Sequence, residues 1–248
     1  MARINVCGHT QSSKFEKANS IMVKLMQQSW WKLLAIFLLC YTVVGGLLFA
    51  VPRLNILNET IRNLYYHVPM WFGMIILFTV SLVYSILYLY RGKLSDDLMA
   101  VETANVGLLL GVLGLLTGMI WANYTWGSPW NGDPKQNMSA IALLIYFAYS
   151  ILRASIPDPT KRARISAVYN IFAFFSMIPL LFVVPRLTDS LHPSNGGNNG
   201  FVVYDLDNQM RLVFYPAVMG FTLLGLWISS LRIRLRLIFD PNYNHSSL

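Results

Sequence analysis

Two histidines on either side of a tryptophan-rich loop are the residues of this chain best suited to chemistry. His67 lies in "YYHVPMW" and His192 in "SLHPSNGG", each closely followed by proline and next to a long apolar run. Neutral imidazole is a common metal ligand and a common axial ligand of haem iron. A zinc site usually takes three or four protein ligands, whereas the neighbouring loops offer these two histidines, no cysteine and scattered aspartates. The pair therefore favours haem iron over zinc, although each histidine taken singly is more often structural. His9 and His245 lie in the tails and are assigned no role.

The loop between the histidines, "NYTWGSPWNGDPKQN" at residues 123–137, carries a pair of tryptophans four residues apart. Trp126 and Trp130, together with Trp121, are expected to form a flat hydrophobic shelf for a planar ligand. Gly127 and the neighbouring Gly and Pro residues would shape the loop that carries them. The alternative is an aromatic belt, since Trp and Tyr gather at membrane interfaces. The belt explains the spacing but not the helix-breaking residues between the rings.

Several polar and aromatic residues near these groups are candidates for support. Asp133 would either cap the following helix or orient Lys135. Trp71 follows His67 by four residues and so lies on the same helical face. Arg62 is the preferred partner for an acidic group of the ligand, with lipid phosphate as the alternative. Three further basic residues are candidates for the same role: Arg53, Arg186 and Arg211.

The elements that must position these residues are six apolar runs. Hydrophobic residues make up 55% of the chain and charged residues 12%, against about 25% charged in a soluble domain. The runs are Leu33–Pro52, Val68–Tyr90, Met99–Trp121, Met138–Ile156, Ser166–Pro185 and Val213–Leu231. Each has about 19 to 23 residues, enough at about 1.5 Å per residue to cross a hydrocarbon core of roughly 30 Å. Because backbone groups in a bilayer must be satisfied locally, the runs are helices. The sequence predicts an all-α integral membrane protein with six transmembrane helices.

The basic residues indicate orientation rather than nucleic-acid binding. With the N-terminus in the cytoplasm, fourteen of the 19 Lys and Arg residues lie on the inner side and five on the outer side. This is the positive-inside bias, and it explains the net charge of +8. Both termini are then cytoplasmic, and "YRGKLSDDL" is a short inner loop. Glu102 and Arg153 are expected near the inner ends of spans, which are otherwise almost free of charge, so an ion pump is not favoured.

The spans occupy the chain and leave no room for a second domain. We expect a cytoplasmic tail at 1–31, with Met22 as a possible start, a six-helix membrane domain at 32–236 and a second tail at 237–248. Cys7 and Cys40 cannot pair in this topology and no CxxC is present, which excludes a thiol oxidoreductase. No hydrolytic or nucleotide-binding motif is found.

Three segments together resemble a known family. "WGSPWNGD" at 126–133 resembles the tryptophan-rich "WGxxWxWD" signature of haem-handling cytochrome c assembly proteins. "RNLYYHVPMW" at 62–71 resembles the first-histidine segment of the haem exporter protein C family (CcmC), and "SLHP" at 190–193 matches its second-histidine segment. The order of histidine, tryptophan-rich loop and histidine makes the chain similar to CcmC within the wider CcmC, CcmF and CcsA group.

The resemblance implies a haem-binding cleft on the outer face of the bacterial inner membrane, with haem b as the ligand. His67 and His192 would be its axial ligands, and Trp126, Trp130 and Asp133 would pack against the porphyrin. The basic residues that the family places near the first histidine and after the aspartate correspond to Arg62 and Lys135. The chain departs from the family pattern at Gly132, where a tryptophan is usual; Trp121 or Tyr124 would compensate for the lost ring.

The resemblance also implies partners: the haem chaperone CcmE, the ABC transporter subunits CcmA and CcmB, and the small protein CcmD. The expected function is to hold haem and deliver it to CcmE during cytochrome c maturation, rather than to catalyse bond formation with its own residues. Two alternatives stay open. One is a subunit of a membrane b-type haem oxidoreductase, and the other is a ligand-free permease or scaffold subunit of an ABC exporter.

Overall fold

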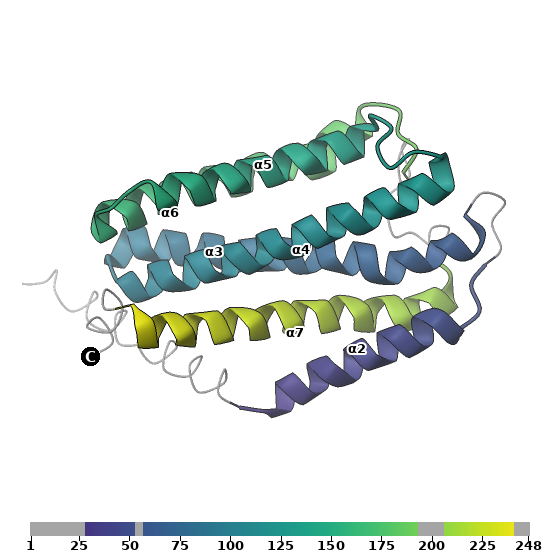
Figure 1. The fold of residues 1–248 in the computed structure, drawn as a ribbon, viewed down its shortest axis with the longest axis horizontal. Helices are drawn as coiled ribbons and strands as arrows, with labels where there is room; N and C mark the ends of the chain where they lie inside the picture. Colours follow the sequence, from purple (N-terminus) through teal and green to yellow (C-terminus); the bar gives the residue numbers. More distant parts are fainter. Residues whose placement is uncertain (1–27, 53–56, 193–205, 241–248) are drawn as a thin grey trace, which may run out of the picture.

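The computed structural model describes residues 28–52, 57–192 and 206–240 (Figure 1). Its long helices are α2 (Trp30–Leu48), α3 (Leu64–Arg91), α4 (Leu94–Trp126), α5 (Pro134–Ala154), α6 (Pro159–Ile178) and α7 (Asn208–Phe239). A short 3-10 helix, η1 (Asn58–Asn63), precedes α3, and α6 continues through a π-helical turn, η2 (Pro179–Val183), into a 3-10 turn, η3 (Val184–Arg186). Within the described residues six helices are long and apolar enough to cross a membrane, which confirms the predicted six-span, all-α protein.

Most of the two expected tails lies outside the described residues. Met22, Cys7, His9 and His245 belong to these parts of the chain, as does Arg53 in the loop after α2. The boundaries of the tails therefore stay predictions.

The helices run along the long axis of the molecule and alternate in direction (Figure 1). α3 lies at the centre and contacts α4, α6 and α7, while α2 packs against α7 at one edge. α5 and α6 pair at the opposite edge. We call the end that contains His67 and His192 the histidine end, and the end that contains Arg153 and Arg232 the arginine end.

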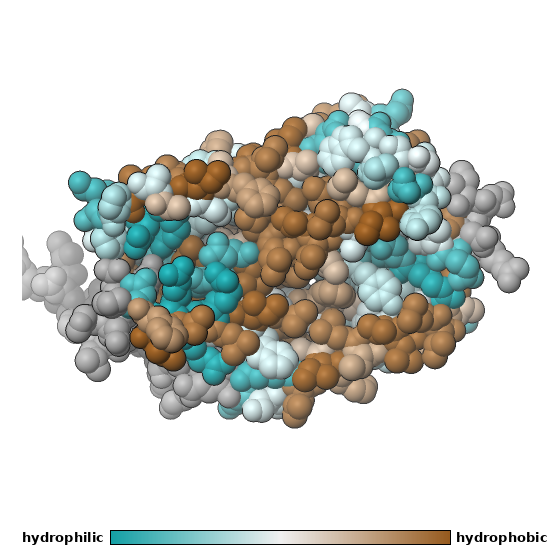
Figure 2. All heavy atoms as spheres, viewed as in Figure 1, coloured by the Kyte–Doolittle hydropathy of each residue, from teal (hydrophilic) through white to brown (hydrophobic). Residues whose placement is uncertain are grey.

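A close-packed apolar core joins α3, α4 and α5 between the two ends. The rings of Phe78 and Tyr146 stack with centroids 3.6 Å apart. A Cβ added at Gly111 would lie 2.5 Å from Leu143 and 2.6 Å from the sulfur of Met74, so only glycine lets α4 approach its neighbours this closely. Apolar side chains also form a band around the middle of the visible face, with hydrophilic atoms toward both ends (Figure 2). This is the surface expected of a protein that crosses a bilayer.

Buried ion pairs at the arginine end correct the predicted inner loop. "SDDL" is not a loop, because α4 begins at Leu94 and buries Asp97 within its first turns. Asp97 accepts hydrogen bonds of 2.7 and 2.6 Å from Arg153 of α5. Glu102, which is 1% exposed, accepts bonds from Arg232 and Arg236 of α7. The expected position of Glu102 and Arg153 near span ends is confirmed, but they serve as helix-to-helix ties.

All six long helices begin before the apolar runs that predicted them, and α4 and α7 show why. α4 continues to Trp126 and α5 begins at Pro134, so the loop predicted at 123–137 is shortened at both ends to residues 127–133. Gly127 ends the helix with a φ of +80°, which glycine adopts without strain. α7 begins at Asn208, before the predicted Val213, because the Asp207 carboxylate accepts a bond from the N–H of Gln209 and caps the helix. Hydropathy marks only the part of a helix that lies in hydrocarbon.

Candidate functional site

The first histidine is held by the backbone of the neighbouring helix. His67 lies in the first turn of α3, and its Nδ1 is 2.7 Å from the carbonyl oxygen of Gly114 on α4. Because a carbonyl only accepts hydrogen bonds, Nδ1 must carry the proton and donate it. The hydroxyl of Thr117 lies 3.3 Å from the same nitrogen and also donates to Gly114. The lone pair of Nε2 is therefore the one that a metal can use.

The space around His67 is fixed by a small residue and a large one. A Cβ added at Gly118 would lie 2.6 Å from Cε1 of His67, so the ring occupies the place that a side chain there would take. Trp71 stands one turn along α3 and meets His67 edge to face, with centroids 6.2 Å apart. The predicted common face of His67 and Trp71 is confirmed. His67 is thus a residue of α3 whose ring packs against α4.

The second histidine is oriented by a carboxylate. The Nδ1 of His192 lies 2.9 Å from Oδ1 of Asp133, whose side chain is 1% exposed. An ionised carboxylate only accepts, so Nδ1 donates and Nε2 again keeps its lone pair. Asp133 also accepts bonds from the Ser190 hydroxyl and the Leu191 N–H, both at 2.8 Å to Oδ2. It therefore fixes residues 190–192 as a unit.

Asp133 has a further bond that settles its predicted role. Its Oδ1 accepts a 2.9 Å bond from the N–H of Lys135, which caps the start of α5. The predicted cap is confirmed, and the same side chain ties α5 to the segment after η3. This double use explains why the aspartate is buried directly in front of Pro134.

The surroundings of Asp133 and His192 favour an ionised carboxylate and a neutral imidazole, as their hydrogen bond requires. Burial alone would raise the pKa of the Asp133 carboxyl, but hydrogen bonds from Ser190 and Leu191 and the neighbouring His192 outweigh it, so this pKa lies below its usual value. Burial lowers the pKa of His192 to about 4; Lys135 acts in the same direction, and Asp133 opposes both. His192 is thus neutral at pH 7 and can donate a lone pair.

Two of the three tryptophans of the predicted shelf surround His192. Trp126 lies 4.9 Å from the His192 ring and Trp121 lies 6.4 Å from it, measured between centroids. The two indoles meet at 72°, so they form a corner and not the flat shelf that the sequence suggests. Trp130 is 39% exposed and makes no ring contact within the described residues, and Tyr124 is 77% exposed. Of the two compensating residues considered for the missing tryptophan, Trp121 is the one in the cluster.

Gly132 has a backbone reason to be glycine. Its φ is +70°, in the left-handed region that strains a larger residue. A Cβ there would meet no atom within 4 Å among the described residues, so space is not the constraint. Glycine therefore stands here in place of the family's tryptophan because the loop makes a left-handed turn just before Asp133.

Lys135 and Arg62 differ in what surrounds them. Lys135 lies within electrostatic reach of both His67 and His192. Arg62 instead donates through Nη1 to the carbonyls of Gly46 and Phe49, at 2.8 and 2.7 Å, at the end of α2.

The remaining bonds of Arg62 are local. Its Nε donates to Glu59 at 2.7 Å, and Nη2 is the nitrogen left without a hydrogen bond in the described part of the chain. Arg62 is therefore a tie between α2 and η1 in this structure.

The two histidines are staggered along α4. The contacts of His67 centre on Gly114 and Gly118, and those of His192 on Trp121 and Trp126. At about 1.5 Å per residue the two sets of contacts are about 10 Å apart along the helix. Across the described residues no three His, Cys, Asp or Glu side chains gather closely enough to hold a metal ion. An iron already bound by a porphyrin needs only the two imidazoles.

Some residues of the site were not found from the sequence. Gly114, Thr117 and Gly118 belong to an apolar helix and carry no chemical signal of their own. Their spacing, with Trp121 at i+7 from Gly114, does place all four on one face of α4, and this was the available clue. Ser190 acts only because the chain brings it to Asp133, which is 57 residues away in sequence.

Fold and site together define a class: a six-span membrane protein with two imidazoles, each with an open nitrogen, beside a tryptophan corner at one end of the bundle. The chain belongs to the family described as Heme exporter protein C, whose profile matches residues 11–245. It is similar to the Heme exporter protein C of Rhodobacter capsulatus, with 29% identity over 179 residues, covering 68% of this chain and 73% of the relative. The protein of the same name from Paracoccus denitrificans is 28% identical over 182 residues, with 71% and 73% covered.

A shorter stretch is shared with a larger protein. Over 76 residues the chain is 41% identical to the Cytochrome c biogenesis protein CcsA of Prochlorococcus marinus, covering 31% of this chain and 24% of that protein. The resemblance to CcmC is confirmed, and membership of the family implies a role in haem handling for cytochrome c maturation.

Proposed function

We propose that this chain binds haem b with Nε2 of His67 and Nε2 of His192 as axial ligands of the iron. The observation that carries the proposal is shared by both side chains: each Nδ1 donates to a fixed acceptor, Gly114 or Asp133, and each Nε2 is left for a metal. Such a second bond holds ligating histidines in one tautomer in metal sites generally. Both rings also belong to the same end of the bundle, within electrostatic reach of one another.

The surrounding residues have distinct parts in this proposal. Trp126, Trp121 and Trp130 supply apolar surface for a porphyrin, and Trp71 backs the first histidine. Gly127 ends α4 so that the chain can turn into the loop.

Basic residues would meet the acidic groups of the ligand. Lys135 supplies positive charge near both imidazoles and suits a haem propionate. Arg62 is a second propionate candidate through Nη2, since its bonds to α2 and Glu59 use Nη1 and Nε.

Holding and transfer is the proposed activity, in a cleft on the outer face of the bacterial inner membrane with both chain ends in the cytoplasm. Haem is the cargo. The chain's residues bind and orient it without attaching the porphyrin covalently. A haem chaperone of the CcmE type is the proposed recipient, with CcmA, CcmB and CcmD as further partners. The exposed ring of Trp130 and the open loop around it are accessible to such a recipient.

Absorption spectra test the proposal. The detergent-purified protein is loaded with haem and its visible spectrum is recorded oxidised and reduced, beside His67→Ala and His192→Ala. The wild type should give a low-spin, six-coordinate spectrum, and each variant should turn high-spin or lose haem. His245→Ala is the matched control and should leave the spectrum unchanged. A wild type that stays colourless after haem is added would refute the haem site and favour a ligand-free scaffold.

One observation favours a second candidate. His67 lies inside α3 and contacts α4, as ligands of membrane b-type haem oxidoreductases do when they are carried within spans. Such a subunit would be reduced by a quinol and reoxidised by an acceptor over repeated cycles, without losing its haem. Transfer of haem to an added chaperone, with loss of colour from this chain, would favour haem delivery over the oxidoreductase subunit.

A further inference from the structure

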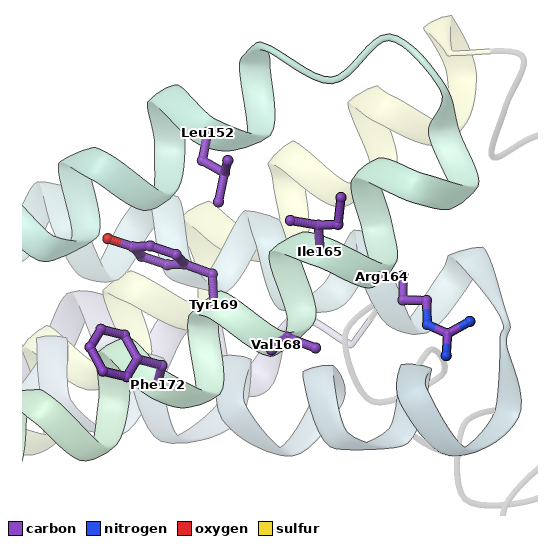
Figure 3. A pocket seen from close by; sticks show the side chains of 6 residues that line it. All are labelled: Leu152, Arg164, Ile165, Val168, Tyr169 and Phe172. Atoms are coloured by element: carbon purple, nitrogen blue, oxygen red, sulfur yellow. The ribbon is translucent and has the colours of Figure 1, made fainter.

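A groove on the outside of α5 and α6 lies in the half of the molecule toward the arginine end (Figure 3). Its volume is about 590 Å³, within the range of roughly 300–1,000 Å³ that small-molecule sites occupy. The lining residues are Leu152 from α5 and Arg164, Ile165, Val168, Tyr169 and Phe172 from α6. It is separate from the histidine site.

The walls of the groove are apolar apart from one charged end. Val168 is 56% exposed and Phe172 is 60% exposed, and they lie one turn apart on α6. The Tyr169 ring lines the groove between them, while its hydroxyl donates to the carbonyl of Ile145 on α5 at 3.3 Å. The one polar group of the walls other than Arg164 is therefore satisfied within the protein.

The depth of the groove matches one leaflet of a bilayer. The apolar span that contains α6 runs from Pro159 to Arg186, 28 residues, or about 42 Å at about 1.5 Å per residue. A hydrocarbon core of roughly 30 Å leaves about 6 Å of this span outside at each end. Arg164 is about 7.5 Å from the start, at the boundary between headgroups and hydrocarbon. Phe172 is about 12 Å deeper, within the half-thickness of about 15 Å.

The charged end of the groove is formed by Arg164. Arg164 is exposed and forms neither a salt bridge nor a hydrogen bond within the part of the chain that the structure describes. Lys161 and Arg162 precede it and add positive charge to the same end of α6. Arg164 thus differs from Arg153, Arg232 and Arg236, which bind buried carboxylates.

We propose that this groove is a binding site for an anionic phospholipid. The guanidinium of Arg164 binds the phosphate at the membrane surface, because arginine matches phosphate geometry with two parallel donors. One acyl chain lies along Val168, Tyr169 and Phe172 in the hydrocarbon. The negative charge of the lipid complements Arg164 on the rim and the two basic residues that precede it on α6, and the site is independent of the haem proposal.

Native mass spectrometry of the whole protein in detergent tests the site. Phosphatidylglycerol is titrated against wild type, Arg164→Gln and Val168→Trp, with phosphatidylcholine as the zwitterionic comparison. Arg164→Gln should weaken phosphatidylglycerol binding about fivefold, the usual effect of one basic residue at a membrane surface. Val168→Trp fills the groove and should reduce binding of both lipids. The expected wild-type preference is for phosphatidylglycerol.

Matched controls separate this site from general lipid contact. Arg234→Gln removes the same charge from α7, and Val43→Trp adds the same ring to the exposed face of α2. Neither should change binding. Equal losses in Arg164→Gln and Arg234→Gln would overturn the proposal in favour of unspecific charge attraction. A small membrane protein that copurifies with wild type in place of lipid, and is lost in Val168→Trp, would overturn it in favour of a partner helix.

Discussion

At the arginine end of the bundle Asp97 accepts two hydrogen bonds from the guanidinium of Arg153, whereas at the histidine end Asp133 accepts one from the imidazole of His192. Both carboxylates are buried, at 3% and 5% exposure. In the first pair the two charges satisfy each other, and the arginine has no lone pair to offer. In the second the carboxylate uses only one nitrogen of the ring and leaves the other open.

The difference separates two uses of a buried carboxylate. The Asp97–Arg153 pair and the Glu102 cluster join α4 to α5 and α7, so they bear on stability. Asp133 joins α5 to residues 190–192 and orients the His192 ring, so under the proposed function it bears on haem binding. Substitutions at the arginine end should therefore change the free energy of unfolding without changing the haem spectrum, and substitutions at the histidine end should do the reverse.

The largest effect is expected from Asp97→Ala. The change leaves the Arg153 guanidinium buried without its partner, which typically costs about 3–5 kcal/mol of unfolding free energy. Unfolding in detergent, followed by circular dichroism, measures the loss. The double variant Asp97→Leu with Arg153→Leu should recover most of it, since replacing a whole buried pair by apolar residues is often close to neutral. A shifted haem spectrum with unchanged stability would contradict the assignment of this end.

Asp133→Asn should have the opposite effect: it should weaken haem binding and leave the free energy of unfolding nearly unchanged. Asparagine still caps a helix but removes the charge that fixes the Nδ1–H tautomer of His192. Loss of such a supporting partner usually lowers metal affinity about 10–100-fold, and haem titration followed by absorbance measures it. Asp158→Asn, at the cap of α6 near the arginine end, is the matched control and should keep wild-type affinity. Equal affinities for the two variants would show that Asp133 is only a cap.

The fold could be predicted further than the site, for a physical reason. A bilayer requires a long apolar helix for each crossing, so hydropathy alone identified six spans. It missed helix ends that lie outside the apolar runs. Gly127 fixes the last turn of α4 and the Asp207 cap fixes the first turn of α7, and neither residue is part of an apolar run.

The buried ion pairs and the α4 residues that hold the His67 ring were missed, because both depend on contacts between residues distant in sequence. Asp97 and Arg153 are 56 residues apart, and adjacent acidic residues near a span end look like a solvated loop. Gly114 acts through a backbone carbonyl that is 47 residues from His67, which no side-chain pattern reveals. The histidines, tryptophans and Asp133 could be singled out as candidates because their residue types are costly or unusual where they stand.

Gly118→Ala tests whether the α4 residue beside His67 affects haem binding more than stability. Its new Cβ would lie 2.6 Å from Cε1 of His67, so the ring must move away from Gly114. Haem affinity should fall about tenfold, as expected when a supporting contact of a ligand is disturbed, with a high-spin component in the spectrum. Gly107→Ala makes the same change about three turns away along α4, 2.9 Å from the Phe78 ring. That control should lower stability and leave the spectrum alone; identical spectra for both variants would mean that the Gly118 position does not set the His67 ring.

Arg62→Gln is expected to have the smallest effect, and it tests a residue that could belong to either class. Its bonds to Gly46 and Phe49 cap the last turn of α2, which otherwise packs mainly on α7. Removing them should lower the unfolding free energy by about 1 kcal/mol, because the side chain is partly exposed and water replaces the lost donors. Thermal unfolding and haem titration are measured on the same sample, with Arg211→Gln as the control for charge at this end. Lower stability at wild-type affinity would make Arg62 a tie of the kind found at the arginine end. A fall in affinity without a change in stability would instead assign its guanidinium to a haem propionate, and the contrast between the two ends would then extend to this arginine as well.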